Sequence, residues 1–207
     1  MTRHDHAPLP KKSPRQARAR ATYDAILQAA AHILTEGGPT ALTTNLVAER
    51  AGVSIGSLYQ YFPSKEAIVA ELIRDLRRQM LSDIKGMAAF VADQPLKFAV
   101  GRMVRASIHH HVHTQGRAEV LEQLEHHLPF DAETDAIKTQ IIDIVTALLE
   151  SHGINQPRSA AFDMINLVVG MAHPALHAGE TDYEALALRI ERAALGYLGL
   201  SASDSVA

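Results

Sequence analysis

The segment of residues 43–65, TTNLVAERAGVSIGSLYQYFPSK, carries the local signals that decide the fold of this chain. One short helix is expected before Gly52, and a second is expected from Ser54 to the residue before Pro63. Two short helices joined by a tight turn that contains glycine form a helix-turn-helix. Gly52 can adopt the left-handed backbone conformation that such a turn needs. We therefore predict a helix-turn-helix at about residues 43–62.

The side chains of this motif divide into an inward and an outward set. Phe62 lies four residues after Leu58, so the two share one face of the second helix. The inward set is expected to comprise Leu46, Val47, Ala48, Ala51, Val53, Leu58 and Phe62. The outward set, which includes Tyr59 and Tyr61, is short or amphipathic and allows close approach to a groove. Tyrosine hydroxyls can bond phosphate oxygens, and Lys65 at the next helix start would strengthen an anion site.

Every periodic segment of the remaining chain also reads as helix, so we expect an all-α protein with about nine helices. A capping box at Ser13 opens the first helix, and Gly37–Gly38 ends it. Ser64 is expected to cap a long fourth helix, and Thr181 with Glu184 forms another capping-box pattern. Further helices are expected near residues 95–113, 117–128, 132–152, 157–177 and 183–200.

The composition narrows the possible classes of protein. The chain has 207 residues and no cysteine, which excludes disulfides and thiolate metal sites. Its apolar runs are too short to span a membrane, and its N-terminus lacks the apolar segment of a signal peptide. We therefore expect a cytoplasmic protein. Up to Arg78, eleven Lys and Arg residues stand against seven Asp and Glu, whereas the remainder has nine against sixteen. This favours contact between the N-terminal third and a polyanion, although chance unevenness gives the same pattern.

The stretch TTNLVAERAGVSIGSLYQYFPSKEAIVAEL resembles the DNA-binding signature of the TetR/AcrR family of bacterial transcriptional regulators. The combination of Ala-Gly-Val-Ser, Leu-Tyr-x-Tyr-Phe and Lys-Glu at this spacing is highly specific, and the resemblance covers roughly residues 15–75. It implies an N-terminal three-helix DNA-binding domain followed by a larger helical domain that binds an effector and forms the dimer. The expected division is a disordered tail at 1–12, the helix-turn-helix domain at 13–63, the effector-binding and dimerisation domain at 64–200, and a flexible tail at 201–207.

The resemblance also implies roles for individual residues. Residues at the starts of the second and fourth helices would contact phosphate, the recognition helix would open at Ser54, and both tyrosines would hold the DNA backbone. Ile55 departs from the polar or basic residue common at its position; it can contact a thymine methyl but cannot make bidentate bonds to guanine. One arginine near the N-terminus, such as Arg18, contacts phosphate or the minor groove unless this face is simply solvated. The expected DNA-binding residues are Thr43, Thr44, Ser54, Ile55, Gly56, Ser57, Tyr59, Tyr61, Lys65 and Arg18.

The C-terminal part has no comparable signature. The helix at 157–177 is apolar almost all round, and the helix at 183–200 has an apolar stripe. In a homodimer these two helices of each subunit would form the interface; intramolecular packing is the alternative. Reading a palindromic operator in double-stranded DNA requires two recognition helices about 34–36 Å apart. By the same resemblance a small-molecule pocket lies in this domain, although each residue proposed for it could equally be simple packing. The residues proposed to line it are Met103, Ser107, His110, Phe130, Met164 and His173.

Two histidine pairs, His109 with His113 and His173 with His177, have the i, i+4 spacing that places two imidazoles on one helix face. Such pairs suit zinc or nickel, but no cysteine or nearby carboxylate completes a ligand set. We therefore expect no metal and no cofactor, with some histidines at the pocket and others in solvent. A metal-sensing regulator remains an alternative.

The leading prediction is a ligand-responsive homodimeric repressor that is not an enzyme and does not enter a membrane. It would bind a palindromic operator and be released by the effector. An all-α enzyme that uses His and Glu is an alternative, but the sequence has no HExxH, no glycine-rich phosphate loop and no nucleophile motif. A helical adaptor that binds only proteins is a third class, and the basic N-terminal third argues against it.

Overall fold

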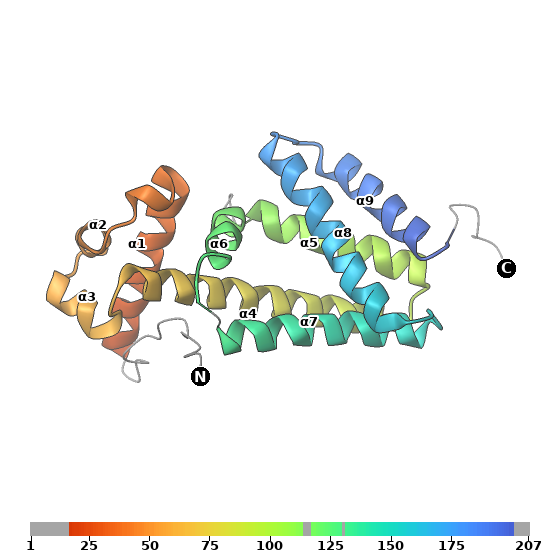
Figure 1. Cartoon of the computed structure of the whole chain (residues 1–207), viewed down its shortest axis with the longest axis horizontal. Coiled ribbons are helices and arrows are strands. Elements are labelled where there is room, and N and C mark those ends of the chain that lie inside the picture. The colour runs from red at the N-terminus through yellow and green to blue at the C-terminus, as the bar shows by residue number, and fades with distance from the viewer. Residues whose placement is uncertain (1–16, 114–116, 130, 201–207) are drawn as a thin grey trace, which may run out of the picture. The chain divides into compact units, whose positions relative to one another are not determined.

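The computed structural model of the chain describes residues 17–113, 117–129 and 131–200. Within these ranges the secondary structure is entirely helical, which confirms the all-α prediction (Figure 1). In chain order the helices are α1 (Ala17–Ala41), α2 (Thr44–Arg50), α3 (Ile55–Tyr61), α4 (Lys65–Val91), α5 (Leu96–His113), α6 (Arg117–Glu125), α7 (Ala132–Ser151), α8 (Pro157–His177) and α9 (Tyr183–Tyr197). No helix in the described ranges has the length and apolar character needed to cross a membrane. The capping box predicted at Ser13 and both predicted tails lie outside the described residues.

The chain divides into two compact units. The first comprises the described residues up to Arg77 together with those between 114 and Asp135, and the second comprises Arg78–His113 and the residues from Ala136 onward. The division therefore falls inside α4 and near the start of α7, and it assigns α6 to the first unit. It differs from the expected boundary after residue 63, because the first half of α4 and part of α6 share one hydrophobic core with α1–α3.

The core of the first unit fixes the position of α3. Leu58 of α3 and Phe62, which caps the end of that helix, are both fully buried. The ring of Tyr23, from α1, stacks on the ring of Phe62 with centroids 5.0 Å apart. Burying a side chain such as phenylalanine stabilises a fold by about 1.5–3 kcal/mol. The end of α3 is therefore held firmly against α1.

A buried arginine lies in the same unit. The Arg74 side chain, on α4, is 1% exposed and donates a hydrogen bond to Glu71 Oε2 at 2.9 Å. It also forms an ion pair with Asp131, the residue just before α7. Burial acts to lower the pKa of Arg74, but the hydrogen bonds with Asp131 and Glu71 outweigh that effect and raise it. The guanidinium therefore stays charged and ties α4 to the start of α7.

A second arginine on α4 pairs with α6. Arg77 donates to Glu122 Oε1 at 2.8 Å and to Glu125 Oε2 at 2.6 Å. All three side chains are largely shielded from solvent. Desolvated, well-aligned ion pairs fix orientation because removing one partner leaves a buried charge unpaired. Arg77 therefore sets how α6 lies against α4 within the first unit.

In the second unit, α5, α8 and α9 pack against one another around a hydrophobic core (Figure 1). Arg105 of α5 donates hydrogen bonds to Glu184 Oε1 at 2.5 Å and to Glu191 Oε2 at 2.8 Å, both on α9. These bonds raise the pKa of Arg105, and the bond from Arg105 lowers the pKa of Glu184. This ion-pair cluster is partly exposed, unlike the buried arginines of the first unit.

Two of the predicted helix signals are confirmed and a third is wrong. The chain leaves helical geometry at Gly38, where φ is 69°, and Ser64 Oγ accepts a hydrogen bond from the Ala67 N–H at 3.3 Å. The capping box was expected at Thr181, but Asp182 caps α9 instead. The helix begins one residue later than that pattern assumes, so the Asp182 carboxylate reaches the free backbone N–H groups.

Candidate functional site

The predicted helix-turn-helix is formed by α2 and α3, which are each seven residues long. Gly52 has the expected left-handed backbone, with φ at 66°, and the Val53 N–H donates to the Ala48 carbonyl at 3.0 Å across the turn. Because Leu58 and Phe62 are buried, the opposite face of α3 is turned to solvent. The geometry therefore places a short helix on the surface with its inner face anchored.

One residue predicted to be buried in α2 is exposed. Leu46 is 39% exposed, whereas the next two residues, Val47 and Ala48, are buried as expected. In a helix of two turns, the face that packs inward is narrow, and here it falls on Val47 rather than on Leu46. Ala51 and Val53 are half-buried against the core. Leu46 therefore belongs to the outer surface near the start of α2.

The outer face of α3 is uncharged and carries short or amphipathic side chains together with one isoleucine. Ser54 caps the helix and accepts a hydrogen bond from the Ser57 N–H at 3.1 Å, and the two hydroxyl oxygens lie 2.8 Å apart. Ile55 is 39% exposed and Tyr59 is 43% exposed. Gly56, between them, adds no side chain, so another molecule can approach the backbone closely. This surface has the size and chemistry to enter a groove.

A hydroxyl pair joins the start of α2 to the second half of α3. The Thr44 Oγ1 and Tyr59 hydroxyl oxygens are 3.2 Å apart, and either can donate. The neighbouring Thr43 caps α2, where its side chain accepts the Leu46 N–H at 3.2 Å. Lys65 is exposed in the first turn of α4. Hydroxyls, a lysine and helix N-termini are the groups that contact phosphate oxygens in DNA complexes.

The second tyrosine of the motif, which was predicted to face outward, is only partly exposed. Tyr61 is half-buried, and its ring packs edge-on to the ring of Tyr23 with centroids 6.2 Å apart. The reason is tertiary, since α1 supplies Tyr23 at that side of α3. Of the two tyrosines, Tyr59 is therefore the more exposed to solvent.

Two exposed polar residues were missing from the predicted set. Gln60 lies on α3 between the two tyrosines, and Asn45 lies in the first turn of α2. Their amides can bond to base edges or phosphates. Their position within the two short helices of the predicted helix-turn-helix was the available signal. The side chain of Arg18, which was predicted to contact DNA, lies outside the described residues.

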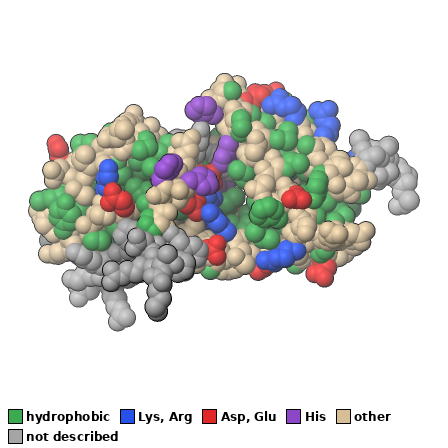
Figure 2. Space-filling model, in the orientation of Figure 1, with side chains coloured by type: hydrophobic (Ala, Val, Ile, Leu, Met, Phe, Trp, Pro, Cys, Tyr) green, Lys and Arg blue, Asp and Glu red, His purple; other side chains and the backbone are tan. Residues whose placement is uncertain are grey.

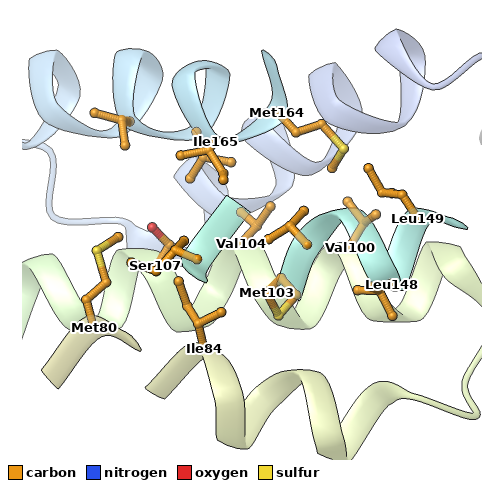
Figure 3. Close-up of a pocket in the computed structure, with 14 residues that line it drawn as sticks. Met80, Ile84, Val100, Met103, Val104, Ser107, Leu148, Leu149, Met164 and Ile165 are labelled. Atoms are coloured by element: carbon orange, nitrogen blue, oxygen red, sulfur yellow. The ribbon is translucent and has the colours of Figure 1, made fainter. Parts of the chain in front are cut away.

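A cavity of about 80 Å³ lies in the second unit, between α4, α5, α7 and α8 (Figure 3). Of the six residues predicted to line a pocket, three do so: Met103, Ser107 and Met164. Thirteen of the fourteen lining side chains are aliphatic or methionine, and Ser107 is the polar one. A concave apolar space of this kind with a single polar group is a candidate site for a small molecule.

The other predicted pocket residues lie elsewhere. His110 is buried on α5, where its Nδ1 lies 3.1 Å from Asp83 Oδ2, and it is not part of the cavity lining. His173 is half-buried on α8 and also lies outside the lining. Phe130 lies outside the described residues.

In the described part of the chain, the two candidate histidine pairs do not belong to a set of side chains that could hold a metal ion. No group of three or more His, Asp or Glu side chains there is arranged to hold an ion. His109 and His177 are exposed, and the side chain of His113 lies outside the described residues.

Part of α8 and α9 remains uncovered in the second unit. Leu186 and Ile190 of α9 are buried, but Leu188 and Tyr197 are exposed, as is Phe162 of α8 at 56%. Hydrophobic side chains reach the surface among polar ones over these helices (Figure 2). The Tyr197 hydroxyl donates to Asp163 Oδ2 of α8 at 2.5 Å, and this hydrogen bond raises the pKa of Tyr197. Each helix thus has one face in the core and apolar side chains on another.

Comparisons with known proteins point to one family for the N-terminal part. The family model described as bacterial regulatory proteins, tetR family, matches residues 26–72. The HTH-type transcriptional repressor KstR of Mycolicibacterium smegmatis is 41% identical over 83 residues, which are 39% of this chain and 41% of that protein. KstR of Mycobacterium tuberculosis is 40% identical over 83 residues, or 39% and 38% of the two chains. The match thus spans about two fifths of the length of these relatives.

Solved structures extend the likeness to nearly the whole chain, at the level of fold. A protein of unknown function from Rhodococcus sp. RHA1 superimposes with a TM-score of 0.72 at 14% identity, covering 86% of this chain and 95% of that one. The fatty acid degradation regulator FadR from Bacillus halodurans gives 0.67 at 17%, covering 88% and 97%. SmeT, the repressor of a Stenotrophomonas maltophilia multidrug efflux pump, gives 0.64 at 19%, covering 86% and 90%.

Proposed function

The chain belongs to the tetR family of bacterial regulatory proteins, and on this premise we propose that it is a transcriptional repressor that releases its operator when an effector binds. The observation that carries the proposal is the uncharged outer face of α3, held by the buried Leu58 and Phe62 and flanked by groups that bond phosphate. Such a repressor acts in the cytoplasm, where the DNA is, and has no catalytic role.

In this proposal the first turn of α3 enters the major groove. Ile55 contacts a thymine methyl, and Ser57 and Gln60 bond to base edges or to the backbone. The paired hydroxyls of Thr44 and Tyr59 and the ammonium of Lys65 hold phosphates on either side. Phosphate contacts fix the position of α3, and base contacts then select the sequence.

The operator is a palindrome read by a homodimer. Two copies of α3 must lie about 34–36 Å apart to read successive turns of the major groove. The exposed apolar residues of α8 and α9, Phe162, Leu188 and Tyr197 among them, support an interface built from these two helices of each subunit. Symmetric packing of the same surface on both subunits gives the two-fold axis that a palindrome requires.

The effector acts through the cavity of the second unit. Met80 and Ile84 of α4 line it, and the same helix carries Lys65 at its start. A ligand can change DNA affinity only if it binds two conformations of the protein with different affinity. We propose that the effector favours a conformation of α4 in which the two recognition helices no longer match the half-site spacing.

Footprinting and gel-shift assays with the DNA upstream of the gene test the DNA-binding role. The double variant Tyr59→Ala/Lys65→Ala should bind at least tenfold more weakly and show a smaller salt dependence, because each lost lysine–phosphate contact reduces the slope by about one. The matched control is Phe90→Ala/Lys138→Ala, which removes an exposed aromatic residue and an exposed lysine from the part of the second unit outside α8 and α9. Absence of protection at moderate salt, or equal binding by both double variants, would overturn the proposal.

A further inference from the structure

The cavity in the second unit has an unusual lining for a binding site. Figure 3 shows its side chains converging from four helices, and thirteen of the fourteen are aliphatic or methionine. No aromatic and no charged side chain takes part. From this composition we infer that the effector site takes a slim, uncharged aliphatic molecule with one hydroxyl or carbonyl group that bonds to Ser107. The inference deepens the proposed function and rests on it for its regulatory meaning.

The lack of charge in the lining excludes ionised ligand groups from the cavity. A carboxylate or ammonium that leaves water needs a counter-charge or several hydrogen bonds, and the lining provides only one hydroxyl. His110, on the same helix as Ser107, has its Nδ1 3.1 Å from Asp83 Oδ2 and lies outside the lining. A neutral ligand is less strongly hydrated than an ion, so it costs less to remove from water, and burial of its aliphatic chain is favourable.

The side chains that line the cavity favour an aliphatic chain over an aromatic ring. Three methionines, Met80, Met103 and Met164, come from three different helices. Their unbranched side chains adapt to irregular shapes and can follow a flexible chain. The absence of aromatic side chains removes any stacking partner for a ring.

Ser107 supplies the directional contact. It is the single polar side chain in the lining, and Figure 3 shows it among the apolar ones on α5. A hydroxyl has one donor and two acceptor positions, so it can bond to a ligand in addition to the contact it makes within the protein. One neutral hydrogen bond contributes modest affinity but fixes which end of the ligand points inward.

Calorimetry and thermal shift with four probes test the inference on the full chain without DNA. The probes are 1-octanol, octanoate, octylammonium and benzyl alcohol, all at pH 8. We expect 1-octanol to bind at least tenfold more tightly than either ion and more tightly than benzyl alcohol. Octanoate or octylammonium binding as tightly as 1-octanol would overturn the uncharged class, and benzyl alcohol binding as tightly would overturn the slim chain.

Two pairs of variants locate the binding. Val168→Phe fills the cavity and should weaken 1-octanol at least tenfold, whereas Val112→Phe should not, although both valines are half-buried against the same core. Ser107→Ala should weaken 1-octanol by about two- to tenfold, and Ser151→Ala on α7 should leave it unchanged. Equal effects within either pair would contradict the assignment.

The probe series on the unmodified chain keeps the inference testable if Val168→Phe does not fold. Binding and DNA release are measured separately, so the two proposals fail separately. If the chain prefers 1-octanol but binds no operator, the ligand class is supported and the repressor role is rejected. If the chain binds its operator but prefers octanoate, the repressor role is supported and the ligand class is rejected.

Discussion

The outer face of α3 and the cavity of the second unit are built in opposite ways. The residues of the α3 face are nearly consecutive, from Ser54 to Gln60, and they are exposed because their buried neighbours anchor the helix. The cavity residues extend from Met80 to Val169 on four helices, and each resembles an ordinary core residue. The residues of the surface site therefore lie close together in the sequence. The residues of the apolar cavity come from four helices, and only their packing brings them together.

The two units also use charge differently. In the first unit, Arg74 and Arg77 are shielded from solvent and paired with carboxylates. In the second, Arg105 and its partner Glu184 are partly or largely exposed. Shielded pairs cost much to break because they leave a charge without water, whereas exposed pairs contribute little. The first unit thus depends more strongly on a few polar contacts, and matched substitutions in the two units can test this difference.

The largest difference is expected between two phenylalanines. Phe62→Ala should lower the free energy of unfolding by about 4 kcal/mol, because the site is fully buried and leaves a cavity beneath Tyr23. Phe90→Ala should lower it by less than about 1 kcal/mol, since Phe90 is 61% exposed and the Arg102 guanidinium carbon lies over its ring, 5.7 Å from the centroid. Chemical denaturation at fixed protein concentration, followed by circular dichroism, measures both. Similar losses would show that α3 is not anchored as described.

The next difference concerns the two arginine clusters. Arg74→Met should destabilise the chain by about 3 kcal/mol, because Glu71 and Asp131 keep shielded carboxylates without their partner. Arg105→Met should cost about 1 kcal/mol or less, since water can solvate the exposed carboxylate of Glu184. The same denaturation experiment measures both variants. A greater loss for Arg105→Met would reverse the proposed ranking of the two units.

Two helix caps provide a smaller and more selective contrast. Ser54→Ala and Asp182→Ala each remove a side-chain acceptor from a helix start, at a cost of about 1 kcal/mol. Only Ser54→Ala should also weaken operator binding, because Ser54 begins the helix that is proposed to enter the groove. Gel shift and denaturation on the same samples separate the two effects. Equal loss of DNA affinity in both variants would mean that stability alone explains it.

The smallest effect is a pH dependence in exposed ion pairs. Glu184 and Glu36 both have a pKa below the ordinary 4.5, because Arg105 and Arg50 donate hydrogen bonds to them. A lowered folded-state pKa contributes stability above the unfolded value, and that contribution is lost as the pH falls through the folded value. The melting temperature of the unmodified chain should therefore exceed that of Glu184→Gln and Glu36→Gln slightly at pH 7, and the gap should close below about pH 4. A gap that widens on acidification would contradict the sign.

Local sequence was sufficient for much of the DNA-binding face. The left-handed Gly52, the Ser54 cap and the buried pair Leu58 and Phe62 all follow from residue type and spacing, and the structure confirms each. The turn and the cap depend on contacts within a few residues along the chain, and the spacing of Leu58 and Phe62 marks the face of α3 that packs inward. The helices of the described ranges were also predicted in type and order, with ends displaced by a few residues.

The errors occurred where a distant helix decides the environment. Leu46 was assigned to the wrong side and Tyr61 is less exposed than expected, because α1 determines which face of a two-turn helix packs inward. His110 was assigned to the pocket, but Asp83 of α4 holds it elsewhere. The sequence around His110 does not indicate that its partner, Asp83, lies 27 residues away along the chain.

The sequence by itself determined the all-helical fold, the helix-turn-helix and the likeness to one family of regulators, because periodicity, caps and a consecutive motif are local properties. Only the tertiary structure decided which side chains surround the cavity and which arginines are buried. Those properties arise when helices far apart in the chain pack together, and the space and charge they enclose belong to no single segment. The outer face of α3 could be anticipated from its own residues, whereas the cavity around Ser107 required the whole second unit.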